Sequence, residues 1–194
     1  MPSYKKNTKF DSTQFPHVHG NRQRFIKRPS VSELFNKLSR QFDLAIWSSA
    51  QHKNAEELVN GIFGNNHNIN IKFIYGQEKC TGIDRPGTYP LFKKDLRKVF
   101  EVFDNVWTKN NTIICDDSDD KFDDNELVKN VIILERFKCD EYSKSMVKQQ
   151  DEFFEKLINL ESETDGKLTA QELLQRVFKG KKKCVFSLFL LSSI

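Results

Sequence analysis

The amino-acid sequence predicts an α/β fold in which a mostly parallel sheet is covered by helices on both faces. Short apolar runs of strand length alternate along the chain with amphipathic segments that have the period of a helix. Parallel strands are buried on both faces and are joined by helical crossovers, so this alternation predicts such a sheet. Two of the apolar runs, 42–47 and 112–115, lead directly into serines or aspartates. In folds of this kind, reactive groups lie beyond the carboxyl ends of the strands.

The expected elements follow from the apolar pattern and from the glycines and prolines that interrupt it. Ser30 is expected to cap the first helix. The segment 1–24 is polar and is expected to be a tail or loop. The predicted order after it is a helix from residue 31, a strand at 42–47, a helix at 53–63, a strand at 69–75, a loop at 77–90, a helix at 91–103, strands at 112–115 and 131–134, and a helix from about 145 to 160.

The first strand of this sheet is expected to be missing. A doubly wound sheet grows outward from a central strand, and nothing before Phe25 is apolar enough to form it. The strands at 44–47 and 113–115 are therefore expected to be separated by a gap or to pair directly in an unusual arrangement. Because each unpaired buried backbone group costs about 1–3 kcal/mol, the chain is expected to be poorly stable.

Composition indicates one globular domain. The chain has 194 residues, 38% hydrophobic and 30% charged, with a formal net charge of +4. Lysine and arginine are not gathered on one helix with aromatics, so no direct nucleic-acid binding is expected. The four cysteines are Cys80, Cys115, Cys139 and Cys184, which are too widely spaced for a disulfide framework or a cysteine zinc site. No transmembrane segment is expected, because the apolar run at 184–191 is too short to span a bilayer.

Two strand ends carry residues that suit phosphate chemistry. Asp116 and Asp117 open an acidic cluster, and adjacent carboxylates at a buried strand end favour a cation such as Mg²⁺. An acidic surface turn explains the cluster equally well. Ser48, at the other strand end, could hold a phosphate oxygen, although helix capping is the commoner role of such a serine. Lys94 lies near the start of the helix expected at 91–103, where a cation favours an anionic partner; a solvated lysine is the simpler alternative.

The order of these pieces is more specific than any one of them. Five blocks, at 25–29, 42–50, 76–82, 90–96 and 113–118, resemble in order and spacing the NLI-interacting-factor-like phosphatases. This family includes the RNA polymerase II C-terminal-domain phosphatases and belongs to the haloacid dehalogenase superfamily. The resemblance implies a three-layer haloacid dehalogenase-like fold at 25–160, followed at 161–194 by a C-terminal helix and a basic and apolar tail.

The resemblance also implies roles for individual residues. Ser48 matches the residue that binds the phosphoryl oxygen, and Lys94 matches the lysine that neutralises the phosphoryl charge. Asp117 matches the direct Mg²⁺ ligand, and Asp116 matches its supporting carboxylate. Such roles suit phosphoryl transfer, which depends mainly on positioning and charge neutralisation. The implied function is a Mg²⁺-dependent phosphoserine/phosphothreonine protein phosphatase with phosphorylated protein substrates, in the nucleus or cytoplasm, with no specific oligomer implied.

The chain departs from the family in its nucleophile. Family members begin with D-x-D-x-T, whose first aspartate attacks phosphorus and whose second acts as acid and base. The nearest local match, Lys9–Thr13, has lysine in the nucleophile position. The sequence therefore predicts that this polypeptide is inactive. The alternative is a non-catalytic binding module, similar to the presequence-receptor subunit of the mitochondrial inner-membrane translocase, which would place the protein in mitochondria.

Two C-terminal features have open alternatives. Residues 161–172 resemble half of an EF-hand loop, but glutamate at the first position fits poorly, so a helix–turn–helix connection is favoured. The tail at 179–194 has a basic cluster followed by an apolar run. An interfacial anchor and a misread exon boundary explain this tail equally well.

Overall fold

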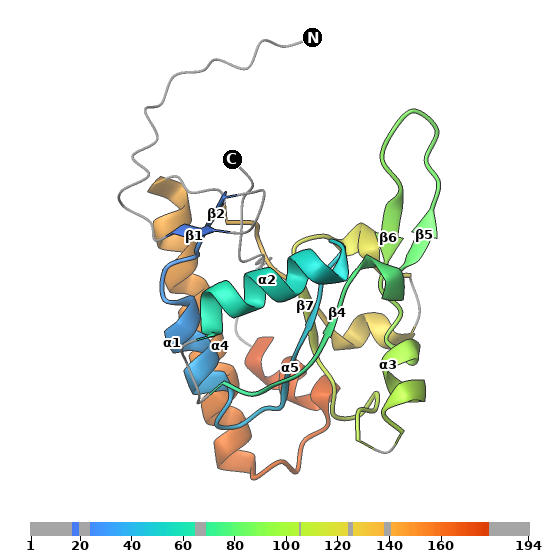
Figure 1. The fold of residues 1–194 in the computed structure, drawn as a ribbon. Coiled ribbons are helices and arrows are strands. Elements are labelled where there is room, and N and C mark those ends of the chain that lie inside the picture. Colours follow the sequence, from blue (N-terminus) through green and yellow to red (C-terminus); the bar gives the residue numbers. More distant parts are fainter. Residues whose placement is uncertain are drawn as a thin grey trace.

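The structure is a computed structural model, and it is an α/β fold as predicted, with helices packed against small sheets (Figure 1). Residues 1–16 and 179–194 lie outside the described residues, and so does the Lys9–Thr13 match. The described residues are 17–19, 24–64, 69–104, 106–123, 126–137 and 141–178.

The core contains four short strands in two parallel pairs: β3 (Leu44–Trp47) with β4 (Ile71–Tyr75), and β7 (Ile114–Asp116) with β8 (Val131–Ile133). Ile46 lies opposite Ile74 in the first pair, and Cys115 lies opposite Ile132 in the second. The four strands match the apolar runs from which strands were predicted, because each run is long enough for a strand and too short for a helix.

The two parallel pairs are not joined to each other within the described part of the chain. Direct pairing of 44–47 with 113–115 is therefore wrong, and among the described residues no strand lies between them, in agreement with the predicted gap. A cavity of about 440 Å³ lies between β3 and β7.

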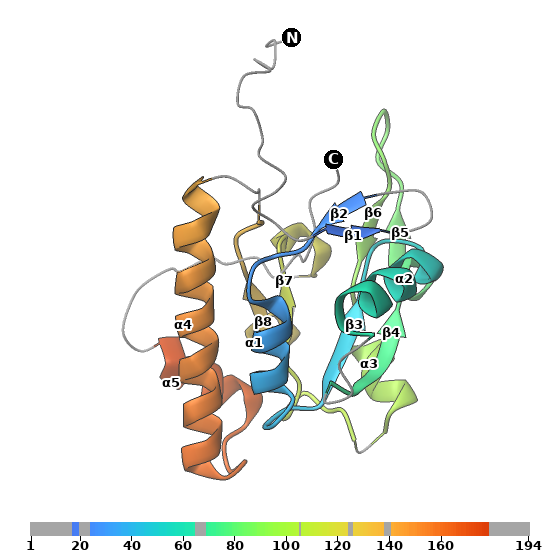
Figure 2. The same cartoon turned by 60° about the vertical axis from the view of Figure 1, so that its left-hand side comes forward.

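Helices cover both pairs of strands (Figure 2). The α-helices of the described residues are α1 (Val31–Leu38), α2 (His52–Phe63), α3 (Arg97–Val102), α4 (Glu141–Thr164) and α5 (Ala170–Phe178). Their buried side chains form two main clusters. The first cluster joins α1 and α2 to β3 and β4. The second cluster joins α1 to β8, α4 and α5. In Figure 2, α2 lies on one side of the strands, and α4 and α5 lie on the other.

Two antiparallel hairpins differ from the sequence prediction. They are β1 (His17–His19) with β2 (Arg24–Ile26), and β5 (Thr81–Ile83) with β6 (Leu91–Lys93). The segment 1–24, predicted as a tail or loop, thus contains strand β1. The segment 77–90, predicted as a loop, contains strand β5. The helix predicted at 91–103 begins only at Arg97, because strand pairing overrides the helical period of its first residues. Gly87, with φ of 75°, lies in the turn of the second hairpin.

Short 3₁₀ helices complete the chain: η2 (Gln77–Lys79), η3 (Asp119–Lys121) and η4 (Glu126–Asn130). The prediction that the Ser30 side chain caps the first helix is wrong. Ser30 occupies the N-cap position of α1, but it has a left-handed backbone and its side chain makes no capping hydrogen bond.

The connection between α4 and α5 is a helix–turn–helix, as predicted. Asp165 and Gly166 both have positive φ in this turn. Glu172 accepts hydrogen bonds from the backbone amide and the hydroxyl of Thr169, each at 2.8 Å, which fixes the start of α5.

Arg28 ties the chain before α1 to α4. Its side chain is fully buried and pairs with Asp151 at 2.7 Å. It also donates to the side-chain oxygen of Gln150 at 3.1 Å and to the carbonyl oxygen of Val147 at 3.3 Å. A buried charge needs such partners, so this cluster fixes α4 against the start of the domain.

Within the described residues, no helix is long and apolar enough to cross a bilayer.

Candidate functional site

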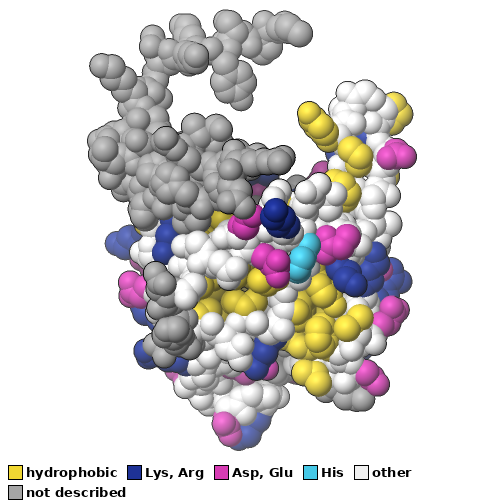
Figure 3. All heavy atoms as spheres, viewed as in Figure 1, with side chains coloured by type: hydrophobic (Ala, Val, Ile, Leu, Met, Phe, Trp, Pro, Cys, Tyr) yellow, Lys and Arg dark blue, Asp and Glu magenta, His cyan; other side chains and the backbone are white. Residues whose placement is uncertain are grey.

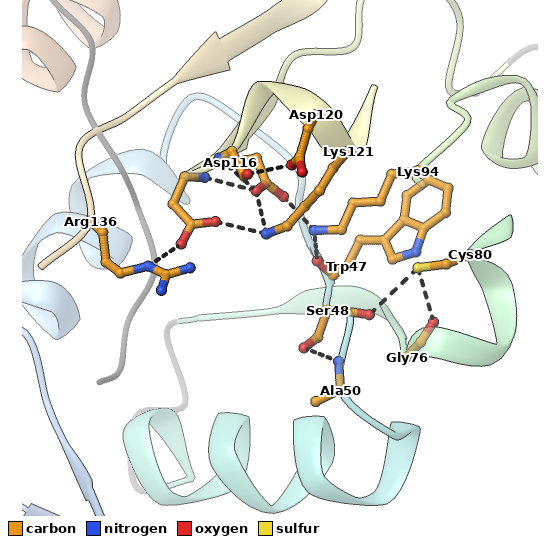
Figure 4. Close-up of polar contacts among 12 residues, drawn as sticks. Trp47, Ser48, Ala50, Gly76, Cys80, Lys94, Asp116, Asp120, Lys121 and Arg136 are labelled. Atoms are coloured by element: carbon orange, nitrogen blue, oxygen red, sulfur yellow. Dashed lines mark hydrogen bonds and ion pairs between the residues drawn. The ribbon is translucent and has the colours of Figure 1, made fainter. Parts of the chain in front are cut away.

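Lys94 lies at the centre of a polar cluster at the carboxyl ends of β3 and β7 (Figure 4). It follows β6 directly, so it is not inside a helix as predicted. Its Nζ donates to the carbonyl oxygen of Trp47 at 2.7 Å and to Asp116 Oδ2 at 2.5 Å. The Lys94 and Asp116 side chains are 1% and 0% exposed. Burial lowers the pKa of Lys94, and the charge of Asp116 partly opposes this shift.

The two aspartates predicted at the end of β7 are both held by cations. Asp116 Oδ1 accepts from Lys121 Nζ at 2.8 Å and from the amides of Asp117 and Ser118 at 2.8 and 3.2 Å. Asp117 accepts from Lys121 Nζ at 2.7 Å on one oxygen and from Arg136 Nε at 2.7 Å on the other. Lys121 therefore bridges the two carboxylates, and each carboxylate oxygen has a donor.

Lys121 and Arg136 were not identified from the sequence. Lys121 lies four residues after Asp117, and η3 carries it back towards the strand end. Arg136 follows β8 at the same edge of the sheet as the end of β7, because the two strands are parallel. A search for charged residues just beyond every predicted strand would have found Arg136. The contact of Lys121 depends on the 3₁₀ turn, which the sequence pattern did not indicate.

Ser48 is at the predicted strand end, but its hydroxyl is directed elsewhere. Its Oγ accepts from the amide of Ala50 at 3.0 Å, and its own amide donates to the carbonyl oxygen of Tyr75 at 2.8 Å. In Figure 4 the hydroxyl points towards the start of α2 and away from Lys94. The structure thus brings together Lys94, Asp116 and Asp117, and leaves the Ser48 hydroxyl outside this group.

Neither described cysteine supplies a thiolate at the site. Cys80 and Cys115 are free thiols. Burial, and to a smaller extent the charge of Asp116, raises the pKa of Cys115 to about 12. Burial also raises the pKa of Cys80, whose Sγ lies 3.9 Å from the carbonyl oxygen of Ser48. Both residues are therefore protonated near neutral pH and are weak nucleophiles.

The geometry does not fit a Mg²⁺ site built from the described residues alone. Mg²⁺ requires near-octahedral oxygen ligands, usually one or two carboxylates with water and substrate oxygens. Here the oxygens of Asp116 and Asp117 already bind ammonium, guanidinium or amide groups. Within the described ranges, no group of three or more His, Cys, Asp or Glu side chains could hold a metal ion. The ammonium of Lys121 occupies the position between the carboxylates that a cation would take.

The Asp117 pairing predicts a dependence of stability on acidic pH. Burial alone would raise the pKa of Asp117, but the hydrogen bonds from Lys121 and its other partners outweigh burial and lower it. A carboxylate with a lowered folded-state pKa stabilises the fold above its ordinary pKa, and this stability is lost as the pH falls through the folded-state value. Urea unfolding should therefore show a larger difference between the native chain and Asp117→Asn at pH 6 than at pH 3. An equal difference at both pH values would contradict the assignment.

The fold and this cluster define an α/β domain of the haloacid dehalogenase-like type, with a lysine–carboxylate pair at the ends of parallel strands. The family model of the NLI interacting factor-like phosphatases matches residues 2–165, so the chain belongs to that family. The match includes the range 25–160 in which the resemblance was recognised. A comparison with curated proteins gives no match. Phosphatases of this type act on phosphoproteins and generally use Mg²⁺.

Proposed function

We propose that this domain binds phosphorylated serine or threonine segments of proteins without hydrolysing them. The observation that carries the proposal is a cluster of three cations, Lys94, Lys121 and Arg136, which Asp116 and Asp117 hold at the carboxyl ends of the strands. The chain belongs to a phosphatase family, in which a lysine that Lys94 matches neutralises phosphoryl charge, and this supports the proposal. The cluster also presents cations to solvent, since Arg136 is 60% exposed and Lys121 is 13% exposed.

The absence of turnover is proposed from the residues at the site. The printed sequence contains no D-x-D-x-T, so it lacks the aspartate that would form the aspartyl-phosphate. Asp116 and Asp117 do not replace it, because their oxygens already bind cations and amides. The expected result is no release of phosphate from an aryl phosphate or a phosphoserine peptide, with or without Mg²⁺. Turnover that disappears in Lys94→Ala would refute the proposal of inactivity.

A presequence-binding module, the alternative function, requires a surface of different charge. Mitochondrial targeting segments are rich in arginine and poor in acidic residues. The exposed guanidinium of Arg136 at the strand ends disfavours such a ligand there and favours an anionic one. A phosphorylated segment is therefore the better match to this end of the domain.

Binding can be tested with a fluorescent serine-rich peptide carrying one phosphoserine, compared with the same peptide without phosphate. We expect a measurable change in anisotropy only for the phosphopeptide. The phosphopeptide should bind the Arg136→Ala variant about tenfold more weakly than the native chain, a loss of about 1.4 kcal/mol of binding free energy. Arg97→Ala is the matched control, because Arg97 is also an exposed arginine, 63% exposed, and pairs with Asp95 instead of with Asp116 or Asp117. Equal binding of the two peptides, or equal loss in both variants, would contradict the proposal.

A further inference from the structure

The space between β3 and β7, called here the strand slot, has the properties of a position for one more strand. We propose that residues 184–191 of this chain occupy the strand slot and pair with β3 or β7, or with both. This inference does not depend on the proposed phosphopeptide binding. It states which segment fills the cavity and gives the C-terminal apolar run a structural role.

The strand slot is apolar and has two strand edges in its wall. Residues of β3 and the segment 112–115 line the cavity of about 440 Å³, together with side chains of α1, α2, α4 and α5. Among the described residues, β3 pairs only with β4 and β7 pairs only with β8, so the edges that face the slot have no strand partner. An added strand would satisfy backbone N–H and C=O groups on both edges and would fill the cavity.

The composition of the apolar run matches a strand buried on both faces. Residues 184–191 read Cys-Val-Phe-Ser-Leu-Phe-Leu-Leu, with one serine as the polar exception. A strand in the middle of a parallel sheet is apolar on both faces, whereas a strand with one solvent face alternates. The N-terminal segment 1–16, which also lies outside the described residues, has lysines at 5, 6 and 9 and an aspartate at 11. It is therefore a much poorer occupant.

The apolar run is close enough to reach the strand slot. Ala170 and Leu173 of α5 line the cavity, and α5 ends at Phe178. At about 1.5 Å per helical residue, Phe178 lies roughly 8 Å beyond Leu173 along the helix axis. The connecting residues 179–183 can extend over about 17 Å. Four of these five are lysines, with a glycine between them, so this linker suits solvent. Figure 3 shows hydrophobic side chains reaching the surface below α2, over the β3–β4 region.

Amide hydrogen exchange tests the proposal on the full chain and on a chain that ends at residue 183. In the full chain, we expect slow exchange of the amides of β3 and β7. Removal of 184–194 should speed their exchange at least tenfold and lower the thermal midpoint, and a synthetic peptide of residues 184–191 should restore slow exchange. A chain that lacks only 192–194 is the matched control and should behave like the full chain. Equal exchange in all three chains would overturn the proposal.

Cysteine cross-linking tests the same inference if the shortened chain does not fold. Cys115 lines the strand slot, so single cysteines placed at 185–191, with Cys80, Cys139 and Cys184 replaced by serine, report proximity to β7. We expect a disulfide with Cys115 within one chain at one position or at alternate positions. No disulfide at any position would overturn the proposal. Disulfides found only between two chains would also overturn it, because the strand would then come from a second copy.

Discussion

Replacing Lys94 with alanine is expected to lower the unfolding free energy by about 3 kcal/mol, because the buried carboxylate of Asp116 loses one of its two ammonium partners and keeps only Lys121. The variant also loses the hydrogen bond to the Trp47 carbonyl, one of the contacts that join the two halves of the core. Urea unfolding followed by far-UV circular dichroism measures the effect. A loss of this size is a large part of the stability of many domains, so a largely unfolded variant is within the expected result.

Lys93→Ala provides the matched control. Lys93 is the neighbouring residue and pairs with Asp123, whose side chain is 55% exposed. Exposed ion pairs contribute up to about 1 kcal/mol, so this variant should stay folded and lose little stability. Equal losses in the two variants would show that the buried position of Lys94 has no special importance. The assignment of Lys94 to the functional site stays a prediction.

Replacing Lys121 with methionine is expected to create affinity for divalent cations. The native chain should show no increase in thermal midpoint with millimolar Mg²⁺, because the ammonium of Lys121 already bridges Asp116 and Asp117. In Lys121→Met, two buried carboxylates lose their shared cation, so the variant should be less stable without metal and should regain stability as Mg²⁺ is added. Ligand binding to the folded state raises stability by mass action, so the midpoint should rise with Mg²⁺ concentration.

Lys121→Arg is the control for charge, since it keeps a cation near the two carboxylates and should stay insensitive to Mg²⁺. The readout is thermal unfolding, and it requires no enzymatic activity. An equal response to Mg²⁺ in the native chain and in Lys121→Met would show that Lys121 does not exclude the metal. In that case the carboxylates would be metal ligands despite their present ion pairs.

The sequence predicted the strands well because their apolar runs are short and continuous. The position of β3 and β7 on either side of a gap was also predictable, since no other apolar run precedes Phe25. The hairpin of β5 and β6 was missed because Leu91–Lys93 also fits the helical period that continues into α3. Whether such an ambiguous segment becomes strand or helix depends on its partner, and pairing partners distant in sequence are not visible in a local pattern.

The sequence predicted where the site residues lie along the backbone better than it predicted their side-chain contacts. Residues at strand ends could be placed because parallel strands end at the same edge of the sheet. The orientation of the Ser48 hydroxyl depends on the local turn into α2, where the Ala50 amide competes for it. The bridge from Lys121 depends on η3, a short turn without a period of its own. Side-chain direction at such turns follows from tertiary packing, which a single sequence does not specify.

Helix α1 contributes buried side chains to both main hydrophobic clusters. Val31 and Phe35 belong to the first hydrophobic cluster, whereas Leu34 and Leu38 belong to the second. Among the described residues, no strand pairing connects the two clusters, and α1 and Leu44 of β3 both pack against the two of them. Two hydrophobic cores that share one helix melt together only while that helix is folded. We therefore expect the two cores to unfold together, because the eight residues of α1 contribute to both of them.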